Sequence, residues 1–337
     1  MREDNFEIPY DVRMQNIAFF GSKGSGKGNH ILPLIANNQF DQHQEGALII
    51  VEDHLMSWML YALAKKYHRK VIFLSPSCNN QMKDLIDIGV STVGDIEQLI
   101  NFEEVMREKQ IVIVDAEPYR YKKRSVDLVA SLLMQLQSSM HTNSHETPFF
   151  TYVQDGDLYL PYLKDLLTYG NQFGMGSVLF FKGRALLQAE SPVLSYFVEA
   201  NIRTTVLTNA LLHEDFKYFK DRFYGDAEDD VVILQRKPNQ LLVETIDEKG
   251  SRKVVFADVR FLQSQIIREI EEEAIRLRQK PAVDMDFSYS VAKEVVASEP
   301  KKKSKKRANN TPRSPIHPAQ PTNQPNKIFI SEEDLFL

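Results

Sequence analysis

The loop Gly21-Ser22-Lys23-Gly24-Ser25-Gly26-Lys27-Gly28 follows the apolar run Asn16-Ile-Ala-Phe-Phe20 and precedes a segment with helical character. A strand, a glycine-rich loop and a helix in this order are the setting of a phosphate-binding P-loop. Glycines allow successive backbone N–H groups to point inward around phosphate oxygens, and the helix N-terminus adds a partial positive charge. We expect Lys27 to reach the outer phosphates of a nucleotide such as ATP.

The spacing of this motif, G-x-x-x-x-G-K, is complete, but the residue after the lysine departs from the usual pattern. Gly28 stands where a Ser or Thr usually holds Mg²⁺. The alternative interpretation is a glycine-rich turn with a solvated lysine. Because a strand precedes the loop, the sequence favours phosphate binding.

The composition is that of a globular protein without a disulfide framework or a cysteine-rich metal site. Of the 337 residues, 43% are hydrophobic, Cys78 is the one cysteine, and the eight histidines show no metal-ligand spacing. No apolar run is long enough to span a membrane, and Met1–Asp11 lacks the pattern of a signal peptide. We therefore expect a cytoplasmic chain that reaches a membrane through a partner. The net charge of −5 carries no general nucleic-acid signature.

Apolar segments with strand character alternate with helical segments between residues 16 and 223. Strands are predicted at 16–20, 46–51, 70–74, 111–115, 149–154, 177–182 and 203–207, and helices at 27–38, 55–68, 94–108, 124–141, 158–171, 184–199 and 212–223. Strands separated by helices predict an α/β fold with a mainly parallel sheet. A β-meander at the sheet edge is predicted at 231–236, 240–246 and 252–256.

We divide the chain into a P-loop ATPase-like domain over 1–262, an amphipathic helix over 263–280 and a disordered tail over 281–337. The tail is polar and proline-rich, with too few apolar residues to offset the entropy of ordering. Its basic run Lys301–Arg307 suits contact with DNA phosphates or anionic lipid, and a solubilising linker is the alternative. The terminal Ser331–Leu337 predicts docking to a partner protein.

Several segments resemble, in order, the conjugative coupling proteins of type IV secretion, the VirD4/TraG-like branch of P-loop ATPases. The G-K-G loop is followed by Pro33, and this branch commonly carries Gly at the position of Gly28. Other segments match from 46 to 54, 70 to 76, 150 to 158 and 169 to 181. The resemblance covers roughly residues 8–210. It implies a RecA-like P-loop NTPase domain that binds ATP and Mg²⁺, forms homo-oligomers, and moves DNA or a DNA–protein substrate towards a secretion channel or membrane partner.

The same resemblance shows departures at the positions that carry the chemistry. Asp155 stands at the Walker B position that holds Mg²⁺, but the following Glu, which would activate water, is Gly156. The family's arginine is replaced by Asn171, or by Gln172, and its Gln by Lys182. Losing a positioned base costs about 10²–10⁴ in rate. A non-hydrolysing adaptor that recruits nucleic acid and a partner through its tail is therefore the alternative function.

A second Walker B candidate follows another apolar strand. Asp115 ends Ile111-Val-Ile-Val, where it could hold Mg²⁺ while Glu117 acts as base, or it could simply cap the turn. The order of segments in the family favours Asp155, the local pattern favours Asp115, and the sequence leaves both open. Asp157 is expected to cap the helix at 158 or to replace the missing Glu.

Further polar residues have weaker patterns. Glu52, Asp53 and His54 end the second strand, where they predict a helix cap or a water-mediated metal contact. The basic segment Tyr121–Arg124 predicts a solvated helix start or a pore loop. By analogy with ring ATPases, Arg184 or Arg203 could act on the nucleotide of a neighbouring subunit.

Overall fold

The structure is a computed structural model that describes residues 8, 10–43, 45–74, 100–121, 123–143, 147–208, 210–224, 239–246, 249–259 and 262–279. The chain divides into two units, Met1–Phe287 and Ser288–Leu337, and every described residue belongs to the first. The predicted tail with Lys301–Arg307 and Ser331–Leu337, the strand at 231–236 and Cys78 lie outside the described residues. The same holds for the side chains of Tyr121, Lys122 and Arg124.

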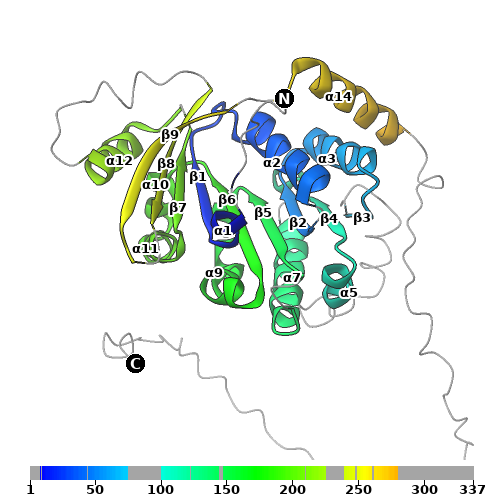
Figure 1. The fold of residues 1–337 in the computed structure, drawn as a ribbon, viewed down its shortest axis with the longest axis horizontal. Helices are drawn as coiled ribbons and strands as arrows, with labels where there is room; N and C mark the ends of the chain where they lie inside the picture. The colour runs from blue at the N-terminus through cyan, green and yellow to red at the C-terminus, as the bar shows by residue number, and fades with distance from the viewer. Residues whose placement is uncertain are drawn as a thin grey trace, which may run out of the picture. The chain divides into compact units, whose positions relative to one another are not determined.

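The described residues form one nine-stranded sheet with the order β3-β4-β2-β5-β6-β1-β7-β8-β9 (Figure 1). Its strands are β1 (Ile17–Phe20), β2 (Gly46–Val51), β3 (Val71–Leu74), β4 (Ile111–Asp115), β5 (Phe149–Gln154), β6 (Met175–Phe181), β7 (Thr204–Leu207), β8 (Gln240–Ile246) and β9 (Arg252–Asp258). The pairs from β3 to β7 are parallel, and β8 and β9 add an antiparallel edge. The predicted mainly parallel α/β sheet is confirmed.

Helical segments connect these strands. The α-helices are α1 (Tyr10–Met14), α2 (Leu32–Asn38), α3 (His54–Lys66), α5 (Phe102–Arg107), α6 (Pro118–Tyr121), α7 (Lys123–Met140), α8 (Gly156–Tyr159), α9 (Lys164–Tyr169), α10 (Arg184–Glu190), α11 (Pro192–Asn201), α12 (His213–Tyr224) and α14 (Ser264–Gln279). Two π-helical turns, η1 (Lys27–Ile31) and η2 (Gln39–His43), flank α2. Two 3₁₀ turns, η4 (Leu160–Tyr162) and η5 (Gly170–Phe173), flank α9.

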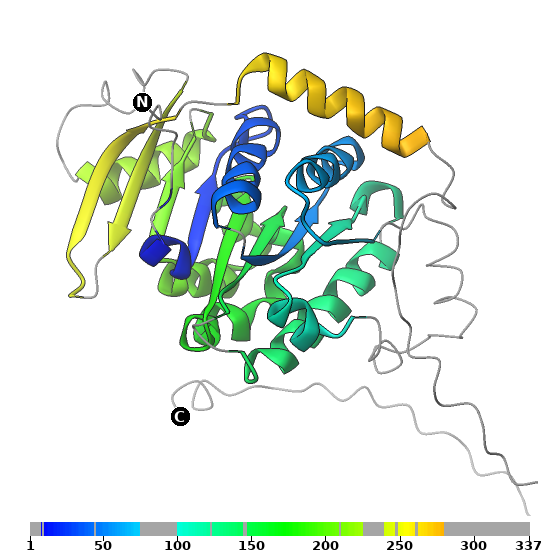
Figure 2. The ribbon, with the colours of Figure 1, turned by 45° about the vertical axis from the view of Figure 1, so that its right-hand side comes forward.

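Helices cover both faces of the sheet (Figure 2). Helices α2, α3 and α14 pack on the face that carries Ile17 and Phe19, whereas α5, α7 and α9 to α12 pack on the face of Ala18 and Phe20. Because the central strands are buried on both sides, they read as continuous apolar runs. The rings of Phe19 and Phe180 stack at 5.0 Å across the β1–β6 pair, which holds these two strands in register.

Two predicted helices are interrupted in the structure. The segment predicted as one helix over 158–171 is built from α8, η4, α9 and the start of η5. The segment predicted over 184–199 is divided into α10 and α11 at Ser191 and Pro192. Pro192 has no N–H for a continuing helix, and Ser191 caps the new one by accepting from the N–H of Leu194 at 3.3 Å.

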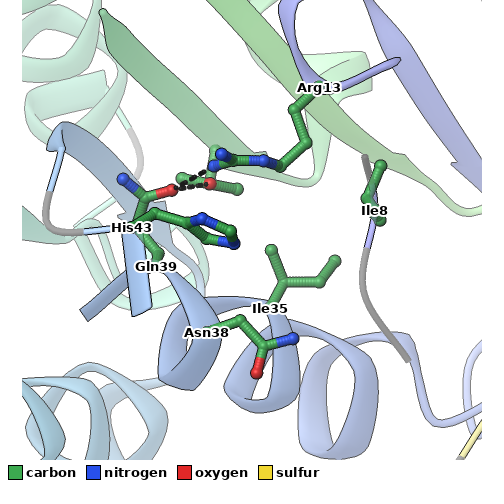
Figure 3. Close-up of a pocket in the computed structure, with 7 residues that line it drawn as sticks. Ile8, Arg13, Ile35, Asn38, Gln39 and His43 are labelled. Carbon is green, nitrogen blue, oxygen red and sulfur yellow. Dashed lines mark hydrogen bonds between the residues drawn. The ribbon is translucent and has the colours of Figure 1, made fainter. Parts of the chain in front are cut away.

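The edge of the sheet at which the parallel strands begin contains a buried ion pair beside a small pocket. The Arg13 guanidinium, before β1, donates to Glu45, before β2, at 2.8 and 3.1 Å. Figure 3 shows Arg13 turned towards Gln39, to which it donates at 3.1 Å, and Ile8 on the pocket wall. This forked pair, which is almost fully buried, connects the starts of two strands that are not adjacent in the sheet.

We expect Glu45→Gln to lower the free energy of unfolding by roughly 3 kcal/mol, because it leaves the Arg13 guanidinium buried without its counter-charge. Urea unfolding would measure this loss. The matched control is Glu108→Gln, which breaks an exposed pair with Lys70 and should change stability little. Equal losses in the two variants would contradict a special role for the buried pair.

Candidate functional site

The parallel strands place the polar residues that follow them along one edge of the sheet. In spatial order across that edge lie Asp115 after β4, Glu52 after β2, Asp155 after β5, Lys182 after β6 and the glycine loop after β1. In open α/β sheets this carboxyl edge is where ligands bind. Only β6 lies between the loop strand β1 and β5, the strand that precedes Asp155. Three strands lie between β1 and β4, the strand that ends at Asp115.

The glycine loop has the backbone shape that its sequence predicts. Gly24 and Gly26 adopt left-handed conformations with φ of 86° and 82°, which side-chain-bearing residues rarely adopt. The π-helical turn η1 begins immediately after Gly26, at Lys27. The first N–H groups of a helix have no partner within it, so they are available to an anion above the loop.

The loop is held by the end of β6 and by the segment that follows β7. The N–H of Gly21 donates to the carbonyl of Phe181 at 3.3 Å, and the N–H of Ser22 donates to that of Ala210 at 2.7 Å. A Cβ atom at Gly21 would lie 1.8 Å from the hydroxyl oxygen of Thr208, so the position requires glycine. The shape of the loop therefore depends on strands far from it in sequence.

Lys27 lies within the loop that it would use to hold phosphate. Its ammonium group donates to the carbonyl of Gly21, and to that of Ser22 at 3.3 Å. Burial lowers the pKa of Lys27, while the carboxyl groups of Asp155 and Asp157 act in the opposite direction. The structure thus brings the loop lysine and these two acidic residues into one electrostatic site, and it does not bring Asp115 there.

Gly28 lies against the side chain of Gln154, the last residue of β5. A Cβ atom at Gly28 would come within 2.8 Å of the Gln154 amide nitrogen. The carbonyl oxygen of the same amide accepts from the N–H of Glu52 at 3.2 Å. Gln154 therefore fills the space in which a Ser or Thr at position 28 would present its hydroxyl group.

Asp155 is paired with a lysine from the neighbouring strand. The Lys182 ammonium group lies 2.6 Å from Oδ2 of Asp155 and donates to the hydroxyl of Tyr119, also at 2.6 Å. Burial alone would lower the pKa of Lys182, but its bonds to Asp155 and Tyr119 outweigh burial and raise it. A positive charge of the protein itself thus faces the Asp155 carboxylate.

Two further carboxyl groups beside this pair are difficult to ionise. Burial and the neighbouring Asp155 raise the pKa of Glu52 to about 7. Burial also raises the pKa of Asp157 to about 7, although its Oδ2 accepts from the N–H of Lys182 at 3.5 Å. Asp157 neither continues the strand nor caps the helix, because α8 begins one residue earlier, at Gly156.

Asp115 and Glu117 lie with His54 in a separate group at the ends of β4 and β2. Nδ1 of His54 is 2.5 Å from Oδ2 of Asp115 and 3.2 Å from Oε1 of Glu117. The predicted cap is made by the neighbouring Asp53, whose carboxylate accepts from the N–H of Met56 at 2.9 Å. Both Walker B candidates therefore have polar partners, but only Asp155 is beside Lys27.

The residues considered for the role of the family's arginine do not point to Lys27. Asn171 and Gln172 belong to η5, which precedes β6, and Arg203 precedes β7, so all three are at the edge opposite the glycine loop. Arg184 follows β6, but its guanidinium is 2.6 Å from Glu199 and lies over the ring of Tyr218 at 3.6 Å. Within the chain, this side chain is therefore engaged away from Lys27.

The sequence did not single out Gln154 and Tyr119 as site residues, and it did not pair Lys182 with Asp155. Gln154 has no motif of its own, and Tyr119 comes from α6, on the far side of β2 from Asp155. The one sequence signal was the missing side chain at Gly28, which leaves space that a residue from another strand fills. Such complementarity becomes visible only once the order of the strands is known.

Comparison with known proteins rests on structure alone, since no protein-family model and no curated protein matches the sequence. VirB4 of Thermoanaerobacter pseudethanolicus aligns at a TM-score of 0.51 and 7% identity, over 75% of this chain and 91% of that one. The bacterial conjugative coupling protein TrwBdeltaN70 aligns at 0.49 and 11%, over 78% and 90%. The genome packaging NTPase B204 from Sulfolobus turreted icosahedral virus 2 aligns at 0.41 and 11%, over 71% and 96%.

The chain has a P-loop NTPase fold. The identity is too low for the comparison to show more than the fold. Among the described residues, no helix is both long and apolar enough to cross a membrane.

The pKa of Asp157 predicts a pH-dependent gain in stability for Asp157→Asn. Because its folded-state value of about 7 lies above its ordinary 3.8, the protonated form stabilises the fold below about pH 4, and this contribution is lost as pH rises through 7. The full shift corresponds to about 4 kcal/mol, and with relaxation we expect Asp157→Asn to be about 2 kcal/mol more stable than wild type at pH 8.

Thermal unfolding between pH 5 and 8 measures this difference, which should shrink as the pH falls. The control is Asp165→Asn, on the exposed side of α9, which should show no such trend. A constant difference between Asp157→Asn and wild type across this range would contradict the raised pKa.

Proposed function

We propose that this chain is an ATP-binding subunit that resembles conjugative coupling proteins and acts in conjugative DNA transfer or type IV secretion, as an oligomer that moves DNA or a DNA–protein substrate. The observation that carries the proposal is the glycine loop with Lys27 at the carboxyl edge, with only β6 between the loop strand and the strand that precedes Asp155. In this assignment Gly21–Gly28 hold the phosphates, Lys27 neutralises them, and Asp155 is the Walker B residue.

The residues present fit a polyphosphate better than they fit a metal ion. The left-handed glycines leave open space above Gly24, and hydrogen bonds to the carbonyls of Gly21 and Ser22 place the Lys27 ammonium group within the loop. Oδ2 of Asp155, by contrast, becomes available to Mg²⁺ only when Lys182 leaves it. The position next to Lys27 offers no hydroxyl ligand, because Gly28 has no side chain and Gln154 fills that space.

The second candidate function is an adaptor that binds the nucleotide but does not hydrolyse it. The pairing of Lys182 with Asp155 favours it, together with Gly156 at the position of the catalytic Glu. Burial raises the pKa of Glu52 and of Asp157 to about 7, a value that suits a general base, so these pKa values do not favour the adaptor over the motor. In either function, we propose that the basic run Lys301–Arg307 contacts DNA phosphates and that the terminal segment Ser331–Leu337 docks to a secretion-channel or membrane partner.

The decisive measurement is ATP affinity and turnover of the full chain, with and without DNA. We expect Lys27→Ala to lose at least tenfold in ATP affinity, because the buried ammonium group is the loop's own counter-charge to phosphate. Lys164→Ala, an exposed lysine on α9, is the matched control and should bind as wild type does. If wild type binds no ATP, both nucleotide-based functions are excluded.

The same measurement separates the two functions. Turnover that DNA stimulates, and that is lost both in Lys27→Ala and in a chain lacking residues 301–307, would establish the motor and its DNA contact. Tight ATP binding without turnover under either condition would establish the adaptor.

The Lys182–Asp155 pair predicts an unusual metal dependence. We expect the ATP affinity of wild type to change less than threefold between excess EDTA and excess Mg²⁺, because Lys182 already balances the Asp155 charge. In Lys182→Gln the freed carboxylate repels the phosphates until a metal ion neutralises it, so Mg²⁺ should then improve the affinity at least tenfold. A strongly Mg²⁺-dependent wild type would show that Lys182 gives way to the ion.

A further inference from the structure

Three side chains from two loops meet at the carboxyl ends of β2 and β4, outside the nucleotide site. His54 is the first residue of α3, Asp115 is the last residue of β4, and Glu117 follows two residues later. The sheet holds these loops together, since Val51 and Asp115 are partners in the β2–β4 pair and the N–H of Ala116 donates to the carbonyl of Val51 at 2.8 Å. With strands about 4.8 Å apart, this place is roughly 19 Å from the glycine-loop strand.

The three side chains present ligand atoms to one another. Nδ1 of His54 lies 2.5 Å from an Asp115 oxygen and 3.2 Å from a Glu117 oxygen, and all three atoms are within 4.8 Å of one another. Ligand atoms around a tetrahedral ion with bonds of about 2.0–2.1 Å are roughly 3.3 Å apart. The group is thus compact enough to close on a single ion with small side-chain movements.

The His54 imidazole alone does not balance the negative charges of the Asp115 and Glu117 carboxylates. The Asp115 side chain is 0% exposed and that of Glu117 is 10% exposed, so both carboxylates are removed from water. Nδ1 of His54 carries at most one hydrogen, and the shorter contact assigns it to Asp115. Oε1 of Glu117, buried and aimed at the same nitrogen, has no hydrogen bond among the described residues. Its other oxygen has a 3.5 Å contact to the exposed Arg120. A buried carboxylate oxygen without a donor is costly, and a cation between the three groups would remove that cost.

We propose that His54, Asp115 and Glu117 bind a divalent first-row transition-metal ion of the Zn²⁺ type, separate from any Mg²⁺ that accompanies the nucleotide. One imidazole nitrogen and two carboxylate oxygens are a donor set that Zn²⁺ and Co²⁺ accept, whereas Mg²⁺ and Ca²⁺ prefer oxygen alone. Three protein ligands leave a fourth position for water. The ion connects the β2–α3 and β4–α6 turns, and α6 carries Tyr119, which contacts Lys182.

The protein carries its own reporter for this site. Trp58 is the one tryptophan of the chain, it is buried on α3, and its ring is edge-on to that of His54 with centroids 6.4 Å apart. A paramagnetic Co²⁺ ion bound by His54 should therefore quench the Trp58 fluorescence, whereas an ion bound to a distant histidine should not.

The test is a Co²⁺ titration of the full chain without nucleotide and in excess Mg²⁺, followed by Trp58 fluorescence and by visible absorption. We expect quenching that saturates at one equivalent and is reversed by stoichiometric Zn²⁺. His54→Ala and Glu117→Gln should each weaken Co²⁺ binding at least tenfold, whereas His213→Ala, an exposed histidine on α12, should leave it unchanged. Glu117→Gln keeps the size of the side chain, so it separates lost ligation from misfolding, which circular dichroism also monitors.

Zn²⁺ provides an independent readout, because an ion that binds only the folded chain raises its melting temperature. Wild type and His213→Ala should show this rise, and His54→Ala and Glu117→Gln should not. Absence of saturable quenching in wild type, or quenching that persists unchanged in His54→Ala, would overturn the proposal and identify the group as an ion triad of the protein alone. Because no nucleotide is present, this outcome is independent of whether the glycine loop binds ATP.

Discussion

The central constraint on this protein is that β4, β2, β5, β6 and β1 all run in the same direction. Parallel strands bring their carboxyl ends to one edge, so side chains from five distant parts of the sequence become neighbours there. The stacked phenylalanine rings of β1 and β6 hold the strand that precedes the glycine loop, and the end of β6 and the segment after β7 accept the loop's first N–H groups. The shape of the glycine loop therefore depends on sheet register as much as on the sequence of the loop itself.

Charge along this edge is balanced locally. Lys182 faces Asp155, Lys27 lies within the field of Asp155 and Asp157, and Glu52 shares the same space. Because these groups are partly or wholly removed from water, changing one of them alters the protonation of the others. The edge thus differs from a simple metal-binding carboxylate site, because the Lys182 ammonium group already faces the Asp155 carboxylate. The two proposed functions differ in whether Lys182 leaves this acidic residue free for a metal ion.

The sequence predicted what depends on local residue type. The glycine loop predicted a backbone that curls around phosphate, Lys27 predicted a cation in that loop, and the apolar runs predicted the strands. It did not predict the break at Ser191 and Pro192, where a proline overrides the helical pattern. It also could not choose between Asp155 and Asp115, since each ends an apolar strand. The choice depends on which strand lies near β1, and that order is set by packing between segments far apart in the chain.

By itself, the amino-acid sequence determined the α/β class, the glycine loop and its lysine, and the absence of a Glu after Asp155. These features follow from backbone freedom, side-chain charge and hydrophobic pattern, which act over a few residues. Only the tertiary structure decided that Gln154 fills the space beside Gly28, that Lys182 pairs with Asp155, and that His54 joins Asp115 and Glu117. Those contacts join segments that are far apart in the sequence. The free energy that sets the order of the strands comes from burying both faces of the sheet, and no short stretch of sequence encodes that order.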